Sequence, residues 1–265
     1  MTFLTFENVS HHYFSTTGYT KALDNISLSI NEGEFVSIIG PSGCGKSTIL
    51  SIIARLMKQT EGEIKLKNEP LVDSPLNIGY MLQQDYLFPW RTVMDNILLG
   101  PKINEQISEE TIKQARKLLE DVNLKHTEND YPSELSGGMR QRIALVRTLI
   151  INPELLLFDE PFSALDYVTK PKLENLVAKL MQTYHKTAIL VTHDLGEAIS
   201  MSDRIFLMET EPGRIAKTFD VPEELRKEEP FFVRRHPKYQ PIFDEIWKYL
   251  SADEQERMTT HEKNN

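Results

Sequence analysis

The sequence predicts an α/β fold with a mainly parallel sheet, and two observations carry that prediction. After residue 33, short apolar and β-branched runs alternate with segments of helical periodicity, and strands that alternate with helices form parallel sheets through right-handed crossovers. Strand-like runs separated by turn signals come before this region, and a mostly helical stretch, residues 84–152, interrupts it. We therefore expect a parallel core with an N-terminal antiparallel β subdomain and an inserted α-helical subdomain.

The individual elements follow in chain order. Strands are predicted where apolar, β-branched runs end at turn signals, and helices where apolar residues recur every three or four positions. The predicted strands are 3–9, 26–30, 35–39, 64–66, 155–158, 187–192 and 205–208. The predicted helices are 46–57, 108–122, 137–150, one that starts near 171, and 239–250.

Composition narrows the class of protein. The chain has 265 residues, of which 40% are hydrophobic and 26% are charged. These fractions are close to those of average globular chains, so the sequence can bury a core, and collagen, coiled-coil and disordered chains are excluded. The formal net charge is −9, from 30 Lys and Arg against 39 Asp and Glu. An acidic balance disfavours a nucleic-acid-binding protein that relies on a basic surface.

Cysteine content and hydropathy bear on the compartment. Cys44 is the single cysteine, which excludes an intrachain disulfide and indicates a reducing compartment. No basic segment followed by an apolar stretch opens the chain, and no apolar run approaches the roughly 18 residues that span a bilayer. We expect a protein that is soluble or peripheral to a membrane. No spacing of Cys and His predicts a zinc site.

A glycine-rich loop follows the strand predicted at 35–39. It fits G-x-x-x-x-G-K-[ST] and precedes a predicted helix, the context that a phosphate-binding loop requires. Glycines let backbone N–H groups converge on phosphate oxygens, and the helix N-terminus adds partial positive charge. Lys46 is expected to contact the β- and γ-phosphates, and Ser47 to offer its hydroxyl to Mg²⁺. The predicted nucleotide-binding residues of the loop are Gly40, Pro41, Ser42, Gly43, Cys44, Gly45, Lys46, Ser47 and Thr48.

Two carboxylates follow the apolar strand predicted at 155–158. Open parallel sheets bind ligands at the carboxyl ends of their strands, so this pair is placed where chemistry is expected. Asp159 is expected to hold Mg²⁺ through its water shell, and Glu160 to polarise an attacking water.

A serine and two glycines open the helix predicted at 137–150. The hydroxyl of Ser136 and the free N–H groups of the first helical turn can face an anion. The chain then holds two phosphate cradles, but only the loop at 40–47 carries a lysine. The second cradle is therefore expected to serve a γ-phosphate bound elsewhere, at an interface.

With these segments the sequence resembles the nucleotide-binding subunit of ABC transporters, over residues 3–220 and with every diagnostic segment in family order. The resemblance implies a P-loop NTPase fold with a RecA-like core, and ATP hydrolysis with Glu160 as general base. It also implies roles for residues outside the loop: Gln83 as the Q-loop glutamine that senses Mg²⁺ and the attacking water, Asp166 as the D-loop aspartate, His193 as the switch histidine at the γ-phosphate, and Tyr13 as the aromatic that stacks on adenine.

Several of these assignments leave an alternative. Tyr13 could also be an ordinary half-buried aromatic residue of a strand. His193 could be a histidine at a strand end whose hydrogen bonds are all made within the protein, and Gln83 could be a polar loop residue. The neighbouring Gln84 leaves the Q-loop register open. Gln83 is preferred because residues 83–90 then align with the family pattern Q-x-x-x-L-[LF]-P-W.

The resemblance further implies a head-to-tail dimer, expected to be a homodimer. Each of two ATP molecules would lie between the phosphate loop of one chain and the signature segment of the other, with Ser136, Gly137, Gly138 and Gln141 acting in trans. A soluble ABC-type ATPase that acts on protein or nucleic acid remains the alternative. An unrelated kinase or GTPase is disfavoured, because the chain has no Asn-Lys-x-Asp motif and the signature segment has no role in a kinase.

Residues 87–96 and the compact length are similar to importer ATPases of the nitrate, sulfonate and taurine group, which includes uptake systems for thiamine precursors. This implies a peripheral protein on the cytoplasmic face of the membrane, a permease bound through residues 86–98, an extracytoplasmic solute-binding protein as an indirect partner, and no nucleic-acid partner. Internal packing is the alternative role for 86–98.

The same resemblance divides the chain into an ATPase domain at 1–220 and a helical tail at 221–265. The polar end of the tail is expected to be disordered. The apolar side chains of the tail are expected to pack on the body of the protein rather than on a partner, and they are Ile242, Phe243, Ile246 and Trp247.

Overall fold

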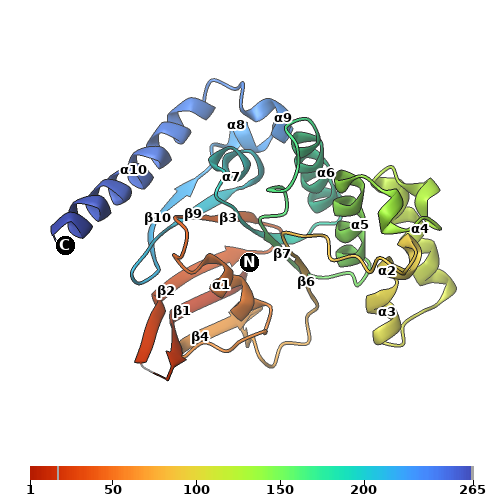
Figure 1. Ribbon diagram of the computed structural model, residues 1–265, viewed down its shortest axis with the longest axis horizontal. Coiled ribbons are helices and arrows are strands. Elements are labelled where there is room, and N and C mark those ends of the chain that lie inside the picture. Colours follow the sequence, from red (N-terminus) through yellow and green to blue (C-terminus); the bar gives the residue numbers. More distant parts are fainter. Residues whose placement is uncertain (17, 264–265) are drawn as a thin grey trace. The chain divides into compact units, whose positions relative to one another are not determined.

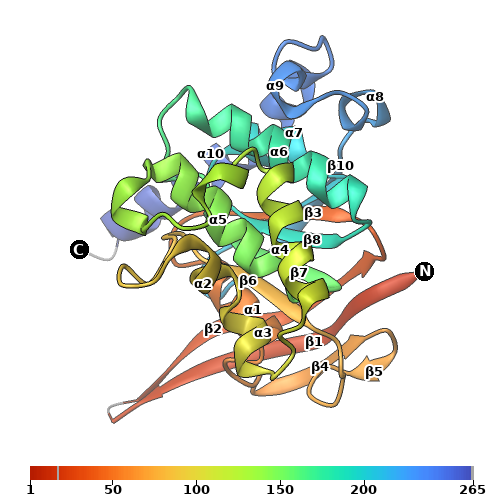
Figure 2. The same ribbon diagram turned by 90° about the vertical axis from the view of Figure 1, so that its right-hand side faces the viewer.

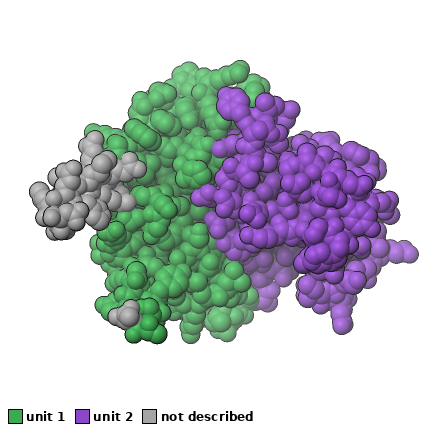
Figure 3. All heavy atoms as spheres, in the orientation of Figure 1, with its two compact units in different colours: residues 1–74, 189–265 green, residues 75–188 purple. Residues whose placement is uncertain are grey.

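The computed structural model describes residues 1–16 and 18–263, with side chains described as far as residue 251. The chain divides into two compact units (Figure 3). Unit 1 consists of Met1–Ser74 and Ile189–Asn265, and unit 2 of Pro75–Ala188. The predicted helical subdomain at 84–152 lies within unit 2.

An antiparallel sheet forms the N-terminal part of unit 1. Its strand order is β2 (Gly18–Asn31), β1 (Thr2–Ser15), β4 (Glu61–Leu66) and β5 (Glu69–Pro70). The β1–β2 hairpin extends well beyond the predicted strands, because aromatic pairs such as Phe14 opposite Tyr19 continue the ladder past the apolar alternation. The expected antiparallel β subdomain is confirmed (Figures 1 and 2).

The second sheet of unit 1 contains the strand that precedes the phosphate loop. The order here is β10 (Arg214–Asp220), β9 (Arg204–Glu209), β3 (Phe35–Ile39) and β8 (Thr187–Val191), and at β8 the chain passes from unit 2 into unit 1. β3 and β9 are parallel, whereas β9 and β10 are antiparallel. Every residue of β3 is buried, as expected for a strand covered on both faces.

Helices α1 (Lys46–Ile53) and α7 (Leu195–Met201) follow the loops that leave β3 and β8. The helix predicted at 46–57 ends earlier, because the chain turns at Arg55, whose φ is +60°. α7 packs on β3, and α8 (Glu223–Arg226), α9 (Pro230–Val233) and α10 (Tyr239–Lys263) pack on α7.

The tail therefore belongs to the core of unit 1. Ile242 and Ile246 are buried beside Leu195 and Phe219, and Phe243 packs against the same cluster. The predicted packing of the tail is confirmed for these three residues. It is wrong for Trp247, which is 55% exposed and stacks on Phe243, because the buried cluster does not extend to its position on the helix. The predicted disorder of the polar end falls largely on residues 252–265, outside the described side chains, and stays a prediction.

Unit 2 is built around α5 (Gly137–Leu149). This helix packs against α2 (Val93–Ile97), α4 (Glu109–Asp121), α6 (Thr169–Thr183) and β6 (Ile78–Met81), and β6 is parallel to β7 (Leu155–Asp159). The unit also contains α3 (Leu99–Ile103) and short 3-10 turns, Lys125–Thr127 and Pro132–Glu134. Helices α2 to α5 are labelled in Figure 2.

Two serines set the helix starts predicted in unit 2. The hydroxyl of Ser108 accepts a hydrogen bond from the backbone N–H of Thr111, and the hydroxyl of Ser136 accepts one from that of Met139. Both are N-caps, so α4 and α5 begin one residue later. β6 escaped prediction because its four residues include Gly79 and give too short a pattern.

Within residues 1–16 and 18–263, no helix combines the length and the apolar character that a membrane crossing requires.

Candidate functional site

The phosphate loop of unit 1 joins β3 to α1. Gly40 has a φ of +153°, and a Cβ atom at this position would lie 2.6 Å from the carbonyl oxygen of Met208. Backbone atoms of β9 cannot give way, so only glycine fits at the first position of the loop. The predicted strand, loop and helix are all present.

Lys46 bends back over this loop. Its Nζ donates hydrogen bonds to the carbonyl oxygens of Gly40, at 2.7 Å, and Pro41, at 2.8 Å, and lies 3.6 Å from the Sγ of Cys44. Burial raises the pKa of the Cys44 thiol more than the nearby Lys46 ammonium lowers it. The thiol stays neutral, so the positive charge of Lys46 is not cancelled within the loop.

Tyr13 of β1 reaches the first turn of α1. Its hydroxyl lies 3.1 Å from the Oγ1 of Thr48 and 3.6 Å from the Sδ of Met57, while 44% of the residue is exposed. His11 packs edge-on against the ring at 4.8 Å, and burial lowers the pKa of His11. The structure therefore holds an accessible aromatic ring beside the helix that carries Lys46 and Thr48.

The loop that carries the predicted switch histidine, residues 192–194, also belongs to unit 1 and follows β8. The buried hydroxyl of Thr192 donates to the carboxylate of Glu197 and accepts from the backbone N–H of Asp194 at 3.0 Å. The Asp194 carboxylate accepts from the backbone N–H of Gly196 at 2.7 Å and so caps α7. His193 is exposed between these two anchored neighbours, a position from which its ring can reach a ligand.

In unit 2, two predicted acidic residues stand at the end of β7. The Asp159 carboxylate accepts a hydrogen bond from the Tyr80 hydroxyl at 3.2 Å. Glu160 has a φ of +48°, unusual for a residue with a side chain. The backbone N–H and the hydroxyl of Ser163 both donate to the Glu160 carbonyl, at 3.2 and 2.9 Å, and stabilise this turn.

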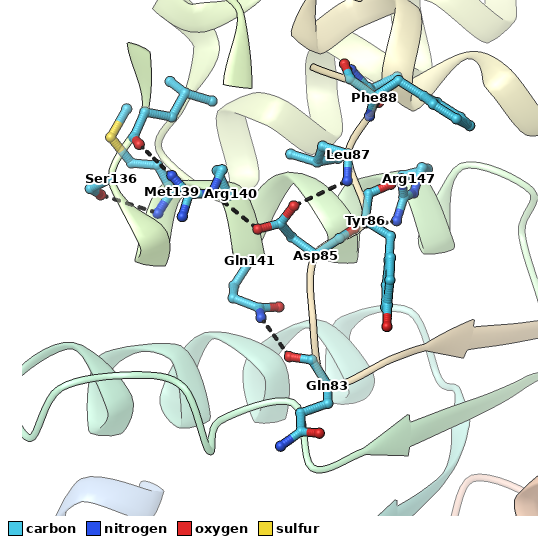
Figure 4. Close-up of polar contacts among 12 residues, drawn as sticks. Gln83, Asp85, Tyr86, Leu87, Phe88, Ser136, Met139, Arg140, Gln141 and Arg147 are labelled. Atoms are coloured by element: carbon cyan, nitrogen blue, oxygen red, sulfur yellow. Dashed lines mark hydrogen bonds and ion pairs between the residues drawn. The ribbon is translucent and has the colours of Figure 1, made fainter. Parts of the chain in front are cut away.

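The side chain of Gln83 joins this group, since its Nε2 donates to the Ser163 hydroxyl oxygen at 3.1 Å. The backbone of the Q-loop is held from the other side by α5 (Figure 4). Gln141 Nε2 donates to the Gln83 carbonyl at 3.0 Å, and Arg140 Nε donates to the Asp85 carboxylate at 3.0 Å.

Arg147 completes the attachment of the Q-loop to α5. Its guanidinium donates to the backbone carbonyls of Asp85, at 2.6 Å, and Tyr86, at 2.8 Å. Burial lowers its pKa, while the charge of Asp85 raises it. We call Arg140, Gln141 and Arg147 the α5 clamp. It fixes residues 83–86 by side chains that come from α5, the signature helix, which follows Ser136.

Residues 86–98 divide into a buried part and an exposed part. Asn96 is fully buried, accepts from the Phe88 backbone N–H at 2.7 Å, and donates to the carbonyls of Phe88, Arg91 and Thr92. Tyr86 is 59% exposed and Trp90 70% exposed, and the Trp90 ring lies 5.2 Å from that of Phe88. The segment is thus anchored inside but presents aromatic side chains outside.

The signature segment packs against the start of α6. A Cβ atom on Gly138 would lie 2.5 Å from the Cγ2 of Thr169, whereas one on Gly137 would meet nothing closer than 3.9 Å. The Asp166 carboxylate accepts from the backbone N–H groups of Val168 and Thr169, at 2.9 and 3.0 Å. Hydrogen bonding, first of all with the Thr169 side chain, lowers the pKa of Asp166.

Gln141 differs in exposure from the other predicted signature residues. It is 3% exposed, and its Nε2 donates to the Gln83 carbonyl of the same chain at 3.0 Å. The side chain is therefore engaged within its own chain, and its action in trans stays a prediction.

The sequence model of the ABC transporter family matches residues 23–163, which is more than half of the chain. The chain belongs to the ABC transporter family. It is an ATP-binding cassette, and therefore an ATPase, as predicted.

Individual relatives are similar over most of their length. This chain is 51% identical to the uncharacterized ABC transporter ATP-binding protein YtlC of Bacillus subtilis, over 97% of this chain and 99% of the relative. It is 41% identical to the aliphatic sulfonates import ATP-binding protein SsuB of Bacillus cereus, over 80% and 83%. The dimeric ATP-binding cassette MJ0796, solved in a post-hydrolysis state with ADP and Pi, superposes with a TM-score of 0.72 at 36% identity, over 83% of this chain and 99% of that one. The predicted fold class is confirmed.

Sequence reasoning missed the residues that hold this cassette's Q-loop. Arg140, Arg147 and Ser163 act through contacts between positions far apart in the chain, whereas Asn96 bonds within residues 88–96. No spacing in the sequence announces such pairs. Gln141 was noticed, but its position on the inner face of α5 was not deduced from the helical period.

Proposed function

We propose that this cassette is the ATP-hydrolysing subunit of an importer. The observation that carries the proposal is the α5 clamp. Helix α5 begins after its N-cap Ser136, beside which a γ-phosphate is expected. Through the clamp the same helix holds the segment that leads to the exposed Tyr86 and Trp90. A displacement at the nucleotide is thereby linked to a surface suited to a partner.

Unit 1 is assigned the binding of ATP. Lys46 contacts the β- and γ-phosphates once they replace the carbonyls of Gly40 and Pro41 as its partners. Tyr13 stacks on the adenine, which its exposed ring allows. His193 contacts the γ-phosphate from the switch loop. ATP binding is thus a matter of backbone amides, one ammonium group and one aromatic face.

Unit 2 is assigned the chemistry. Glu160 acts as general base and takes a proton from the attacking water. Gln83 and Asp159 contact the metal, and Gln83 also senses the attacking water. Asp166 holds the start of α6 beside Gly138.

Mg²⁺ fits the donor set of this chain. Ser47, Gln83 and Asp159 offer a hydroxyl, an amide oxygen and a carboxylate, the hard oxygen ligands that Mg²⁺ prefers. Within the described residues, no group of three or more His, Cys, Asp and Glu side chains could form a protein cage for a metal. This agrees with an ion that keeps waters and phosphate oxygens as ligands. When bound, the ion supplies neutralising charge to the phosphate oxygens.

The signature segment is assigned to a second chain's nucleotide. Ser136 and Gly137 are exposed at the start of α5, and a helix N-terminus attracts anions. A homodimer with two such sites follows from this assignment. The dimeric cassette that superposes on this chain supports it.

The proposed partner is a membrane permease, bound through the aromatic side chains of residues 86–98 on the cytoplasmic face of the membrane. Exposed aromatic residues on a rigidly held loop are typical anchors of protein interfaces. For the solute, the sulfonate importer among the relatives supports a small organic anion of the sulfonate type, delivered by a solute-binding protein.

A pull-down tests the importer assignment. Tagged Glu160→Gln chain, which is expected to retain ATP, is incubated with detergent-solubilised membranes of the source cell and Mg-ATP, and partners are identified by mass spectrometry. Recovery of a multi-span permease is expected, and the matched Glu160→Gln, Trp90→Ala chain should lose it. Recovery of ribosomal, repair or cluster-assembly proteins alone would favour the soluble ABC-type ATPase instead.

A further inference from the structure

Ser163 lies between two residues of the proposed hydrolytic machinery, and the proposed function gives it no role. We propose that Ser163 fixes which end of the Gln83 side-chain amide faces the metal. It is a positioning residue, and the proposal rests on the assignment of Gln83 as a residue that senses Mg²⁺.

The argument follows the single proton of the Ser163 hydroxyl. That proton is donated to the backbone carbonyl of Glu160 at 2.9 Å, and a carbonyl oxygen can only accept. The Ser163 oxygen therefore has only acceptor capacity left for its contact with Gln83. The contact must be made by the amide nitrogen of Gln83, as the 3.1 Å bond from Nε2 requires.

The consequence concerns the oxygen of the amide. The two ends of a glutamine amide have nearly the same shape, so only hydrogen bonds distinguish them. With Nε2 committed to Ser163, the Oε1 atom is left for other partners. A cation is bound by Oε1 and repelled by the N–H groups of the other end, so an amide in the opposite orientation is useless as a metal ligand.

The backbone on both sides of the contact between Gln83 and Ser163 is held by other hydrogen bonds. The Gln83 carbonyl accepts from Gln141 Nε2 at 3.0 Å. The turn at Glu160 is held by the backbone N–H of Ser163 as well as by its hydroxyl. Removing the hydroxyl from the exposed Ser163 therefore leaves the turn a hydrogen bond and opens no cavity, so Ser163→Ala is expected to fold.

Metal affinity, rather than turnover, tests the proposal. Mn²⁺ is used as the probe, and its binding to the full-length chain saturated with a non-hydrolysable ATP analogue is followed by the loss of the free-ion EPR signal. Loss of one hydrogen bond that selects the orientation should weaken Mn²⁺ binding about fivefold in Ser163→Ala. Ser163→Thr keeps the hydroxyl and should bind Mn²⁺ as the original chain does.

A double variant separates the proposed role of Ser163 from the proposed metal role of Gln83. If Ser163 acts through Gln83, adding Ser163→Ala to Gln83→Ala should weaken Mn²⁺ binding no further. Weak binding in Gln83→Ala with normal binding in Ser163→Ala would overturn the role of Ser163 and leave that of Gln83 intact. Normal binding in Gln83→Ala would overturn the metal role of Gln83 itself. Equal losses in Ser163→Ala and Ser163→Thr would also overturn the proposal, because the hydroxyl would not be the cause.

Discussion

The phosphate loop of unit 1 and the Q-loop of unit 2 are both short segments that follow a strand, yet they are held in different ways. Lys46 bonds to carbonyls five and six positions earlier in the chain. The Q-loop is held by Arg140 and Arg147, which act across 55 to 62 positions. The first loop is shaped by its own residues, and the second by a distant helix.

This difference separates binding from coupling. The bonds that place Lys46 in the phosphate loop are local, although Gly40 lies close to Met208 of β9. Because Arg140, Gln141 and Arg147 join α5 to the Q-loop, we propose that a displacement of α5 is passed on to residues 83–90.

The largest expected effect separates the chemistry of unit 2 from the binding of unit 1. Glu160→Gln should lower ATP turnover by about 10² or more, as expected for loss of a general base, with ATP affinity retained. Lys46→Ala should weaken ATP binding itself, because it removes the charged phosphate contact. Turnover and equilibrium ATP binding are measured for both variants. Normal turnover in Glu160→Gln would remove that residue from its role.

The next largest effects are expected when the side chains of the α5 clamp are removed. Arg147→Ala removes the charged donor of two backbone carbonyls, those of Asp85 and Tyr86, which should lower the free energy of unfolding by about 2 kcal/mol. Arg140→Ala breaks a partly exposed ion pair with Asp85 and one bond to the Leu135 carbonyl, and should cost about 1 kcal/mol. Denaturant titration of the two variants compares these values. Equal losses would show that backbone attachment is not what holds the Q-loop.

The signature segment offers a matched pair of glycines. Gly138→Ala forces a methyl group against Thr169 and should destabilise the cassette by about 1–2 kcal/mol. Gly137→Ala places its methyl group at an ordinary contact distance, 3.9 Å, from Arg140 and should leave the melting temperature unchanged or slightly higher. Adding Thr169→Ser, which removes only the Cγ2 atom, should restore Gly138→Ala. Failure of this rescue would show that the steric contact with Thr169 is not the cause.

The smallest effects concern Tyr13. Tyr13→Ala should weaken ATP binding about tenfold, within the range of one aromatic stacking contact. Tyr13→Phe keeps the ring, loses the contact with Thr48, and should change ATP affinity by no more than about twofold. Fluorescent-ATP titration distinguishes the two. A large loss in Tyr13→Phe would assign the residue to the support of α1 instead of to adenine.

The same contrast explains how far the sequence could lead. The loop at 40–48 is one continuous motif between a strand and a helix, so its glycines and Lys46 could be placed from the sequence. Gln83 was identified only by resemblance, because a glutamine in a polar loop carries no signal of its own. The hydrogen bonds from Arg140, Arg147 and Ser163 depend on the packing of α5 and β7, which no local pattern encodes.

The predicted ends of helices and strands were accurate where a local side-chain contact, such as a helix cap, sets them. The starts of α4 and α5 could be placed within a residue because Ser108 and Ser136 cap them. The β1–β2 hairpin was underestimated, since its outer half pairs exposed aromatic and polar residues without apolar alternation. Trp247 was assigned to the core because it shares a helical face with Phe243, although the core ends before reaching it.

The central claim is that unit 1 of one chain and the signature of another act on the same nucleotide. Mixing Lys46→Ala chains with Ser136→Arg chains tests it directly, because each variant should be inactive by itself. A mixed dimer contains one site with an intact phosphate loop and an intact signature, so ATPase activity should reappear on mixing. An inactive mixture of chains that demonstrably form mixed dimers would contradict the shared site.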